Sequence, residues 1–209
     1  MSKVLSELLP VKLFIGMLSQ DIPLLDEIKE KLIEIFGPID LKSPVWEWNH
    51  TDYYLKEMGD GLKRQFVFFK ELIKPDAIAE IKLKTIELEK QHLKKTIMPT
   101  SQYKGEEKLP LPHPPPSRGG GEGEGEKVFS EGKGRRINLD PGYMDTVKIV
   151  LASTKDFSHR IYLGKGIYGE VTLIYSGKGY QILPYTFPDF RTQEYQDIFK
   201  KAREIYKKS

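Results

Sequence analysis

The chain has 209 residues, 39% hydrophobic and 30% charged, a composition typical of a globular protein that buries one sizeable core. It contains no cysteine, which excludes disulfides, thiolate nucleophiles and cysteine-bound metal centres and fits the reducing cytoplasm in which we expect it. The net charge of +3 is too small to indicate nucleic-acid binding, although residues 135–209 carry 13 Lys and Arg against 8 Asp and Glu.

We expect neither a signal peptide nor a membrane-spanning helix. The best apolar run near the start, Leu13–Leu18, is too short for the core of a signal peptide. No stretch approaches the roughly 20 apolar residues that a membrane-spanning helix needs.

The first 98 residues predict the order strand, helix, strand, strand, helix. A run that is apolar on both faces is typical of a central strand, and a capping Asp followed by helical spacing up to a Gly-Pro pair defines a helix. The expected elements are a strand over Lys12–Leu18, a helix from Asp21 to Gly37, strands over Val45–Leu55 and Arg64–Leu72, and a helix capped by Asp76.

Residues 99–134 predict a disordered insertion. Six proline and eight glycine residues fill 14 of its 36 positions, and such a segment cannot bury enough apolar surface to offset the entropy that ordering would cost. We therefore expect residues 1–209 to form a single α+β domain that this Pro/Gly-rich segment interrupts.

Short β runs and a helix follow the insertion. Together with the first part, this order predicts a ferredoxin-like βαββαβ layer that is extended by C-terminal β-hairpins and a closing helix. The runs are Ile137–Leu139, Val147–Ala152, Ile161–Leu163, Ile167–Tyr175 and Tyr180–Tyr185, and the helix covers Tyr195–Lys207.

Polar residues crowd the C-terminal third, and this crowding predicts a site. Asn138 and Asp140 lie at an Asp-Pro-Gly turn, where Asp140 is either part of the turn chemistry or a metal ligand or general base. His159 is either a structural donor or a proton shuttle oriented by Asp156 or Asp140. Glu170 lies on a strand face with apolar neighbours, so it either pairs with a cation or takes part in chemistry.

The segment from Gly164 to Val171 matches the glycine loop of protein kinases, G-x-G-x-x-G-x-V, letter for letter. The catalytic loop and the metal-binding Asp of a kinase have no counterpart in the chain, so the match does not indicate a kinase. The glycines either let backbone N–H groups approach phosphate oxygens or hinge a hairpin that binds nothing.

The predicted strand Val45–Leu55 also has two interpretations. Alternation along a strand places Trp46, Trp48, His50, Asp52 and Tyr54 on one face. Facing a cleft, this set would supply aromatic walls for a planar ligand and a His–Asp pair. Facing a helix, it would be part of the core.

Seven segments carry a family resemblance: Lys12–Leu18, Thr51–Tyr54, Glu57–Gly59, Thr85–Glu89, Arg136–Tyr143, Leu151–Tyr175 and Pro184–Arg191. Together they resemble an uncharacterised prokaryotic family known as a domain of unknown function. Some of its members are labelled GTP-binding protein, but this chain has neither a Walker A loop nor an N-K-x-D guanine motif. The resemblance implies kinship and a cytoplasmic setting, not a mechanism.

We favour a cytoplasmic binding domain for a phosphate-bearing metabolite or nucleotide, with catalysis left open and a divalent metal as an optional cofactor. The catalytic or metal-binding candidates are Asp52, Asp140, His159 and Glu170. The ligand-binding candidates are Asn138, Lys155, Arg160, Gly164, Lys165, Gly166, Tyr168, Trp48 and Tyr54.

Two alternatives of other classes remain. The basic last third and the Trp/Tyr-rich strand favour a nucleic-acid-binding accessory protein whose aromatic residues stack on bases. A non-catalytic interaction module instead predicts that Asp140, His159 and Glu170 form a closed, satisfied network. The sequence leaves the oligomeric state open.

Overall fold

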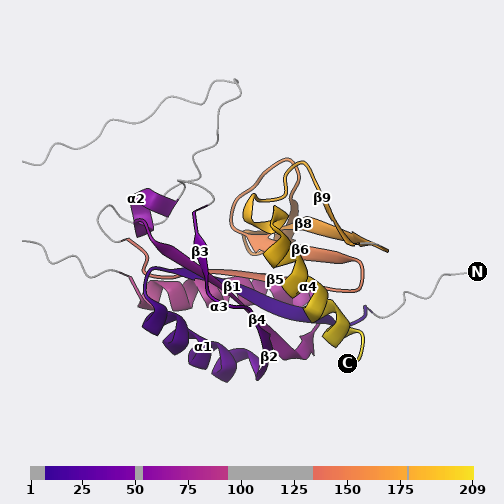
Figure 1. Cartoon of the computed structure of the whole chain (residues 1–209), viewed down its shortest axis with the longest axis horizontal. Helices are drawn as coiled ribbons and strands as arrows, with labels where there is room; N and C mark the ends of the chain where they lie inside the picture. The colour runs from indigo at the N-terminus through magenta and orange to yellow at the C-terminus, as the bar shows by residue number, and fades with distance from the viewer. Residues whose placement is uncertain (1–7, 50–53, 94–133, 178) are drawn as a thin grey trace, which may run out of the picture. The chain divides into compact units, whose positions relative to one another are not determined.

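Strand β1 (Val11–Ser19) is the centre of the fold, because all nine of its residues are buried. It pairs antiparallel with β4 (Leu62–Ile73) on one side and with β5 (Asn138–Met144) on the other, so one sheet joins the two parts of the chain. The computed structural model describes residues 8–49, 54–93, 134–177 and 179–209 (Figure 1). These residues belong to one compact unit, and the segment predicted to be disordered lies, except for Gly134, outside them.

The described chain is an α+β structure built on a nine-stranded antiparallel sheet. Its strand order is β2-β4-β1-β5-β6-β8-β7, with β3 also paired to β4 and β9 also paired to β8. The remaining strands are β2 (Ile39–Lys42), β3 (Trp46–Trp48), β6 (Lys148–Ser153), β7 (Ile161–Gly164), β8 (Ile167–Ser176) and β9 (Gly179–Ile182). The helices are α1 (Ile22–Phe36), α2 (Leu55–Met58), α3 (Ile78–Gln91) and α4 (Gln193–Tyr206).

Helices cover both faces of the sheet (Figure 1). Alternation along β1 sends Leu13, Ile15 and Met17 into a core with α1 and α3. Phe14 points to the other face, where its ring lies 4.8 Å edge-on from that of Phe199 of α4. No helix among the described residues is both long enough and apolar enough to cross a membrane.

The helix ends follow ordinary capping chemistry in part. The Asp21 side chain accepts a hydrogen bond from the Leu24 N–H at 3.1 Å, and Gly37 ends α1 with a φ of 88°. The predicted cap of α3 by Asp76 is wrong, because a 3₁₀ turn over Pro75–Ala77 precedes α3 and no side chain caps it.

The predicted strand over Val45–Leu55 is also wrong in its length. Strand β3 ends at Trp48, and Tyr54 already lies in the turn before α2. Trp48 pairs with Leu62, the first residue of β4, so no partner strand extends beyond it. Strand β2 was missed, because proline on both sides of its four residues hides it as loop.

The Asp-Pro-Gly segment is not a turn but part of β5. Leu139 directs its N–H and C=O away from β1, toward side chains of α3, so alternation puts the nitrogen of Pro141 on the same outer side. Pairing with β6 begins only at Gly142, and Pro141 therefore interrupts no ladder hydrogen bond.

Gly142 is required by close approach rather than by a turn. A Cβ atom there would lie 2.5 Å from the Phe14 ring and 2.5 Å from the Val150 carbonyl oxygen. We expect Gly142→Ala to lower the free energy of unfolding by about 3 kcal/mol, the upper end of ordinary overpacking, because the backbone oxygen cannot move aside. Urea unfolding measures this loss.

Gly177→Ala is the matched control, since Gly177 has a φ of 47° and nothing within 4 Å of the added atom. It should cost about 1 kcal/mol through backbone conformation alone. Equal losses in the two variants would contradict the close-approach explanation.

Candidate functional site

The sheet opens between β5 and β6, and side chains of α3 close the gap. Over residues 138–141 the outer edge of β5 has no strand partner in the part of the chain that the structure describes. Glu89 accepts the Leu139 N–H at 2.6 Å, and Lys82 donates to the Leu139 carbonyl at 2.8 Å. Both side chains are buried. Burial raises the pKa of Glu89, although the charges of Lys82 and Arg135 and the Leu139 N–H act against this rise.

Asp140 lies at this gap and accepts hydrogen bonds from two elements. Its Oδ2 receives Arg64 Nη1 at 3.0 Å and Asn138 Nδ2 at 2.8 Å, and its Oδ1 lies 3.8 Å from Lys82 Nζ. Burial alone would raise the pKa of Asp140, but the charges of Lys82 and Arg64 and these hydrogen bonds lower it below its usual value. A carboxylate held ionised in this way is a weak base and a good hydrogen-bond acceptor.

Arg64 connects Asp140 to the C-terminal loop. Its side chain is only 4% exposed, and its Nη2 lies 3.5 Å from Asp189 Oδ2. The same carboxylate oxygen accepts the indole N–H of Trp48 at 3.1 Å. Burial opposes the charge of Arg64, yet Tyr195, Asp140 and Asp189 raise its pKa above the usual value. Arg64 is therefore permanently charged and neutralised by acidic partners.

A second cluster forms around Glu170 on β8. Its Oε2 accepts Arg160 Nε at 2.7 Å and lies 3.2 Å from His159 Nε2, while Thr172 donates to its Oε1 at 3.1 Å. The Glu170 side chain is 1% exposed and that of His159 is 23% exposed. Glu170 is thus the carboxylate that orients His159, in place of the predicted Asp156 or Asp140.

Aromatic rings hold His159 in a parallel stack. Its ring lies 4.3 Å from Tyr185 at an interplanar angle of 13°, and 5.9 Å from Phe157 at 10°. The Arg160 guanidinium lies over the Phe157 ring at 4.8 Å and also donates to the Lys155 carbonyl at 3.0 Å. The loop before β7 therefore presents His159 at the surface in one fixed orientation.

Among the described residues, the Asp140 and Glu170 clusters have no side chain in common. Leu151 of β6 pairs with both Gly142 of β5 and Glu170 of β8, so β6 lies between Asp140 and Glu170. Two strand spacings and two residues along the strand separate their Cα atoms by on the order of 10 Å. The structure brings together Asn138 with Asp140, and Arg160 and His159 with Glu170.

The glycine segment forms the turn between β7 and β8. Gly164, Lys165 and Gly166 have φ angles of 101°, 55° and 75°, which require or favour glycine. Lys165 forms an ion pair with Glu80 of α3. Tyr168 packs against the ring of Tyr162 at 5.3 Å.

The two aromatic candidates from the first half of the chain, Trp48 and Tyr54, lie together. The ring of Trp48 lies 5.4 Å from that of Tyr54, and Trp48 is buried. The Arg135 guanidinium lies over Tyr54 at 5.8 Å. Asp52, a predicted catalytic residue, lies outside the described residues.

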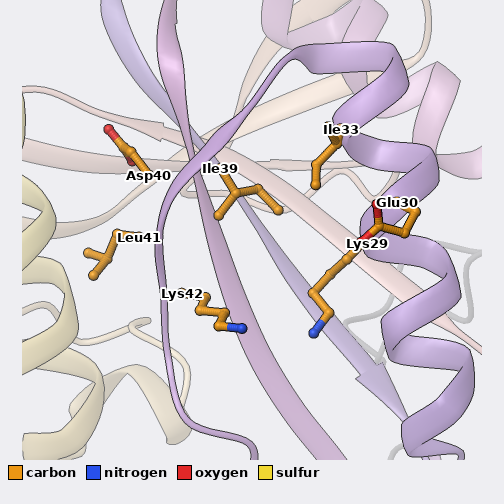
Figure 2. A pocket seen from close by; sticks show the side chains of 7 residues that line it. All are labelled: Lys29, Glu30, Ile33, Ile39, Asp40, Leu41 and Lys42. Atoms are coloured by element: carbon orange, nitrogen blue, oxygen red, sulfur yellow. The ribbon is translucent and has the colours of Figure 1, made fainter.

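None of the predicted site residues that the structure describes lines either of two cavities elsewhere on the molecule. A cavity of about 330 Å³ lies between α1 and β2, where Lys29 and Lys42 flank Ile33 and Ile39 (Figure 2). A cavity of about 200 Å³ is lined by Ser19, Gln20, Asp21, Met58, Arg135 and Arg136. Within the described ranges, no three His, Asp or Glu side chains gather as ligands of a metal ion would.

Sequence reasoning missed several residues that build these clusters. The sequence pattern marks Arg64 only as the first residue of a strand and gives no signal for Lys82. Asp189 and Tyr185 lie in Pro184–Arg191, a segment that the family resemblance had marked without assigning a role. The family resemblance over this segment was therefore the one sequence feature that could have pointed to Asp189 and Tyr185.

The chain belongs to the family described as Domain of unknown function (DUF4416), whose profile matches residues 9–97 and 124–206. This confirms the resemblance drawn from the sequence. No curated protein matches the chain. No solved structure matches it either.

We expect Asp140→Asn to lower the free energy of unfolding near pH 7 by about 3 kcal/mol, because it leaves buried Arg64 with Asp189 as its remaining acidic partner. The pKa of Asp140 is lower in the folded state than the ordinary value of 3.8 for an aspartate. Its stabilisation is therefore complete above that value and is lost as the pH falls through the folded pKa. The difference between wild type and variant should shrink below pH 3.8.

Urea unfolding at neutral pH and near pH 3 measures both effects. Asp156→Asn is the control, since Asp156 is exposed, and it should stay within about 0.5 kcal/mol of wild type. A difference for Asp140→Asn that is independent of pH would contradict the assigned ionisation.

Proposed function

We propose that this domain binds a phosphate-bearing metabolite or nucleotide at the surface formed by His159, Tyr185 and Arg191. The observation that carries the proposal is the partly exposed His159 ring, held by buried Glu170 and stacked on Tyr185. A rigid aromatic and polar surface of this kind suits a planar ligand with hydrogen-bonding groups.

The hydrogen bonds of His159 favour a defined role for its second nitrogen. Glu170 Oε2 accepts the Arg160 Nε–H, so the imidazole nitrogen that faces the same oxygen, Nε2, is assigned as a donor. Nδ1 then carries the lone pair and has no hydrogen-bond partner among the described residues. It can accept a hydrogen bond or a proton from a ligand.

Arg191 supplies a cation on the loop that carries Tyr185. Its Nε donates to the Thr186 carbonyl at 2.8 Å and its Nη2 to the Pro184 carbonyl at 3.0 Å, on either side of Tyr185. Nη1 has no partner among the described residues, and Arg191 is exposed. Arg64 and Arg160 are instead neutralised by buried carboxylates, which makes Arg191 the better candidate for a phosphate group.

A second candidate, the non-catalytic interaction module, is favoured by a different observation. Asp140 and Glu170 are each saturated by cations and neutral donors, as a scaffold requires. The nucleic-acid alternative loses one of its supports, since Trp48 is buried and its indole N–H is bound to Asp189.

We also propose a specific topology for the sheet and a cellular location for the protein. The order β2-β4-β1-β5, all antiparallel, with α1 and α3 on one face, supports a ferredoxin-like layer within the larger sheet. The absence of cysteine supports a cytoplasmic location.

Calorimetric titration with ATP, GTP and pyrophosphate, each with and without Mg²⁺, tests the function. We expect at least one of them to bind, and Arg191→Gln to weaken that binding by roughly tenfold or more through the loss of a charge-assisted hydrogen bond. His159→Gln should weaken the nucleotides more than pyrophosphate, because only nucleotides carry a base.

Lys42→Gln is the control, since Lys42 lies on β2 at the other end of the sheet. Its dissociation constants should stay within about twofold of wild type. Absence of heat at millimolar concentrations of all three compounds would overturn the proposal, and so would equal affinities for wild type and Arg191→Gln.

A further inference from the structure

Strand β7 forms the outer edge of the sheet. It pairs with β8 on one side and with no other strand among the described residues. Strand β9 lies along the same side of β8, because β6 occupies the opposite side over Tyr168–Ile174. The backbone groups on the outer side of β7 are therefore available to another strand.

Three consecutive large apolar residues are exposed on this edge. Ile161 is 71% exposed, Tyr162 60% and Leu163 41%, so side chains on both faces of the strand meet solvent. Ile182 of β9 extends the apolar edge at 49% exposure. Exposed edge strands are usually protected by charge, proline or a covering element, and an unprotected apolar edge favours pairing.

The opposite edge of the sheet is built differently. Strand β2 carries Asp40 and Lys42, whose side chains project from it (Figure 2). Asp40 is also fixed by an ion pair with Lys12 at 2.6 Å. One edge of the sheet, β2, therefore carries charged residues, whereas the other edge, β7, carries none.

The charges around β7 fit a second copy of the chain. When a four-residue strand pairs antiparallel with its own copy, the residue on the two-fold axis faces itself and the others face residues of the same short strand, so a charge on the strand would lie close to its own copy. Residues Ile161–Gly164 carry no charge, and the cations on either side of the strand are paired within the chain, Arg160 with buried Glu170 and Lys165 with Glu80 of α3. An isologous two-fold contact is also the commonest arrangement in soluble oligomers.

We propose that β7 is the pairing edge of a two-fold symmetric homodimer, in which the β7 strands of two copies run antiparallel and join their sheets. The apolar side chains of Ile161, Tyr162 and Leu163 then pack against those of the other copy. This proposal is independent of the ligand proposed at His159, and its test needs no ligand.

Sedimentation of the wild type at concentrations up to the order of 100 µM measures the dimer directly. Ile161→Lys places two like charges in the contact and should raise the dimer dissociation constant roughly tenfold or more. Ile161 is largely exposed, so the change should leave the fold intact. Ile35→Lys, at a 42% exposed apolar position on α1, is the matched control and should leave the dimer unchanged.

Disulfide trapping locates the contact. The chain has no cysteine, so a single cysteine crosslinks only with its own copy. Residues directly opposite in an antiparallel pair have Cα atoms about 4.5–5.5 Å apart, within the range of a disulfide. Among Ile161→Cys, Tyr162→Cys and Leu163→Cys, the variant nearest the two-fold axis should crosslink at least tenfold faster than Val147→Cys, which is 51% exposed elsewhere.

Two results would overturn the proposal. One is a wild-type protein that stays monomeric at every concentration tested, in which case the partner of β7 would be a strand of another protein. The other is a dimer that Ile161→Lys leaves intact and that no cysteine on β7 traps.

Discussion

The pairing of Arg64 with Asp140 across β1 is the contact on which the rest of the structure depends. In the sheet, Gly16 of β1 pairs with Asp140 on one side and with Phe66 on the other. Because Gly16 has no side chain, nothing on β1 separates Arg64 from Asp140. A Cβ atom at Gly16 would lie 2.9 Å from Arg64 Nη1, so the guanidinium passes directly over this glycine. A charge from β4 thereby reaches a carboxylate on β5, and the two parts of the chain are joined through the central strand.

The buried charges around β5 serve the backbone first. An unpaired strand edge inside a protein would leave N–H and C=O groups without partners, which is costly. Glu89 and Lys82 satisfy both groups of Leu139, and Arg135 contacts Glu89 at 3.4 Å and Asn138 at 2.7 Å. The raised pKa of Glu89 reflects the cost of burying a carboxylate for this purpose. This half of the polar network therefore has the character of a scaffold.

Sequence patterns predicted what depends on local chemistry. The helix from Asp21 to Gly37 has this character. The cluster at Glu170 was predicted only in part, because pairing of Glu170 with a cation was one of two readings, whereas Asp156 or Asp140 was expected to orient His159. The partners of Asp140 could not be predicted, because Arg64 is 76 positions distant and reaches it only once β1 lies between them. The prediction of a turn at Asp-Pro-Gly was wrong for a related reason. The segment can be part of β5 because β6 does not pair with it before Gly142.

The loop Pro184–Arg191 connects the scaffold to the exposed surface. Thr186 donates to the Thr172 carbonyl at 2.6 Å beside Glu170, Tyr185 stacks on His159, and Asp189 binds Arg64 and Trp48. One short segment therefore contacts both clusters, although the two have no side chain in common among the described residues. Because its polar contacts are to buried groups, the loop holds Tyr185 in place without help from a ligand. The surface at His159 is thus preorganised, so the binding that we propose there would require little ordering of the protein.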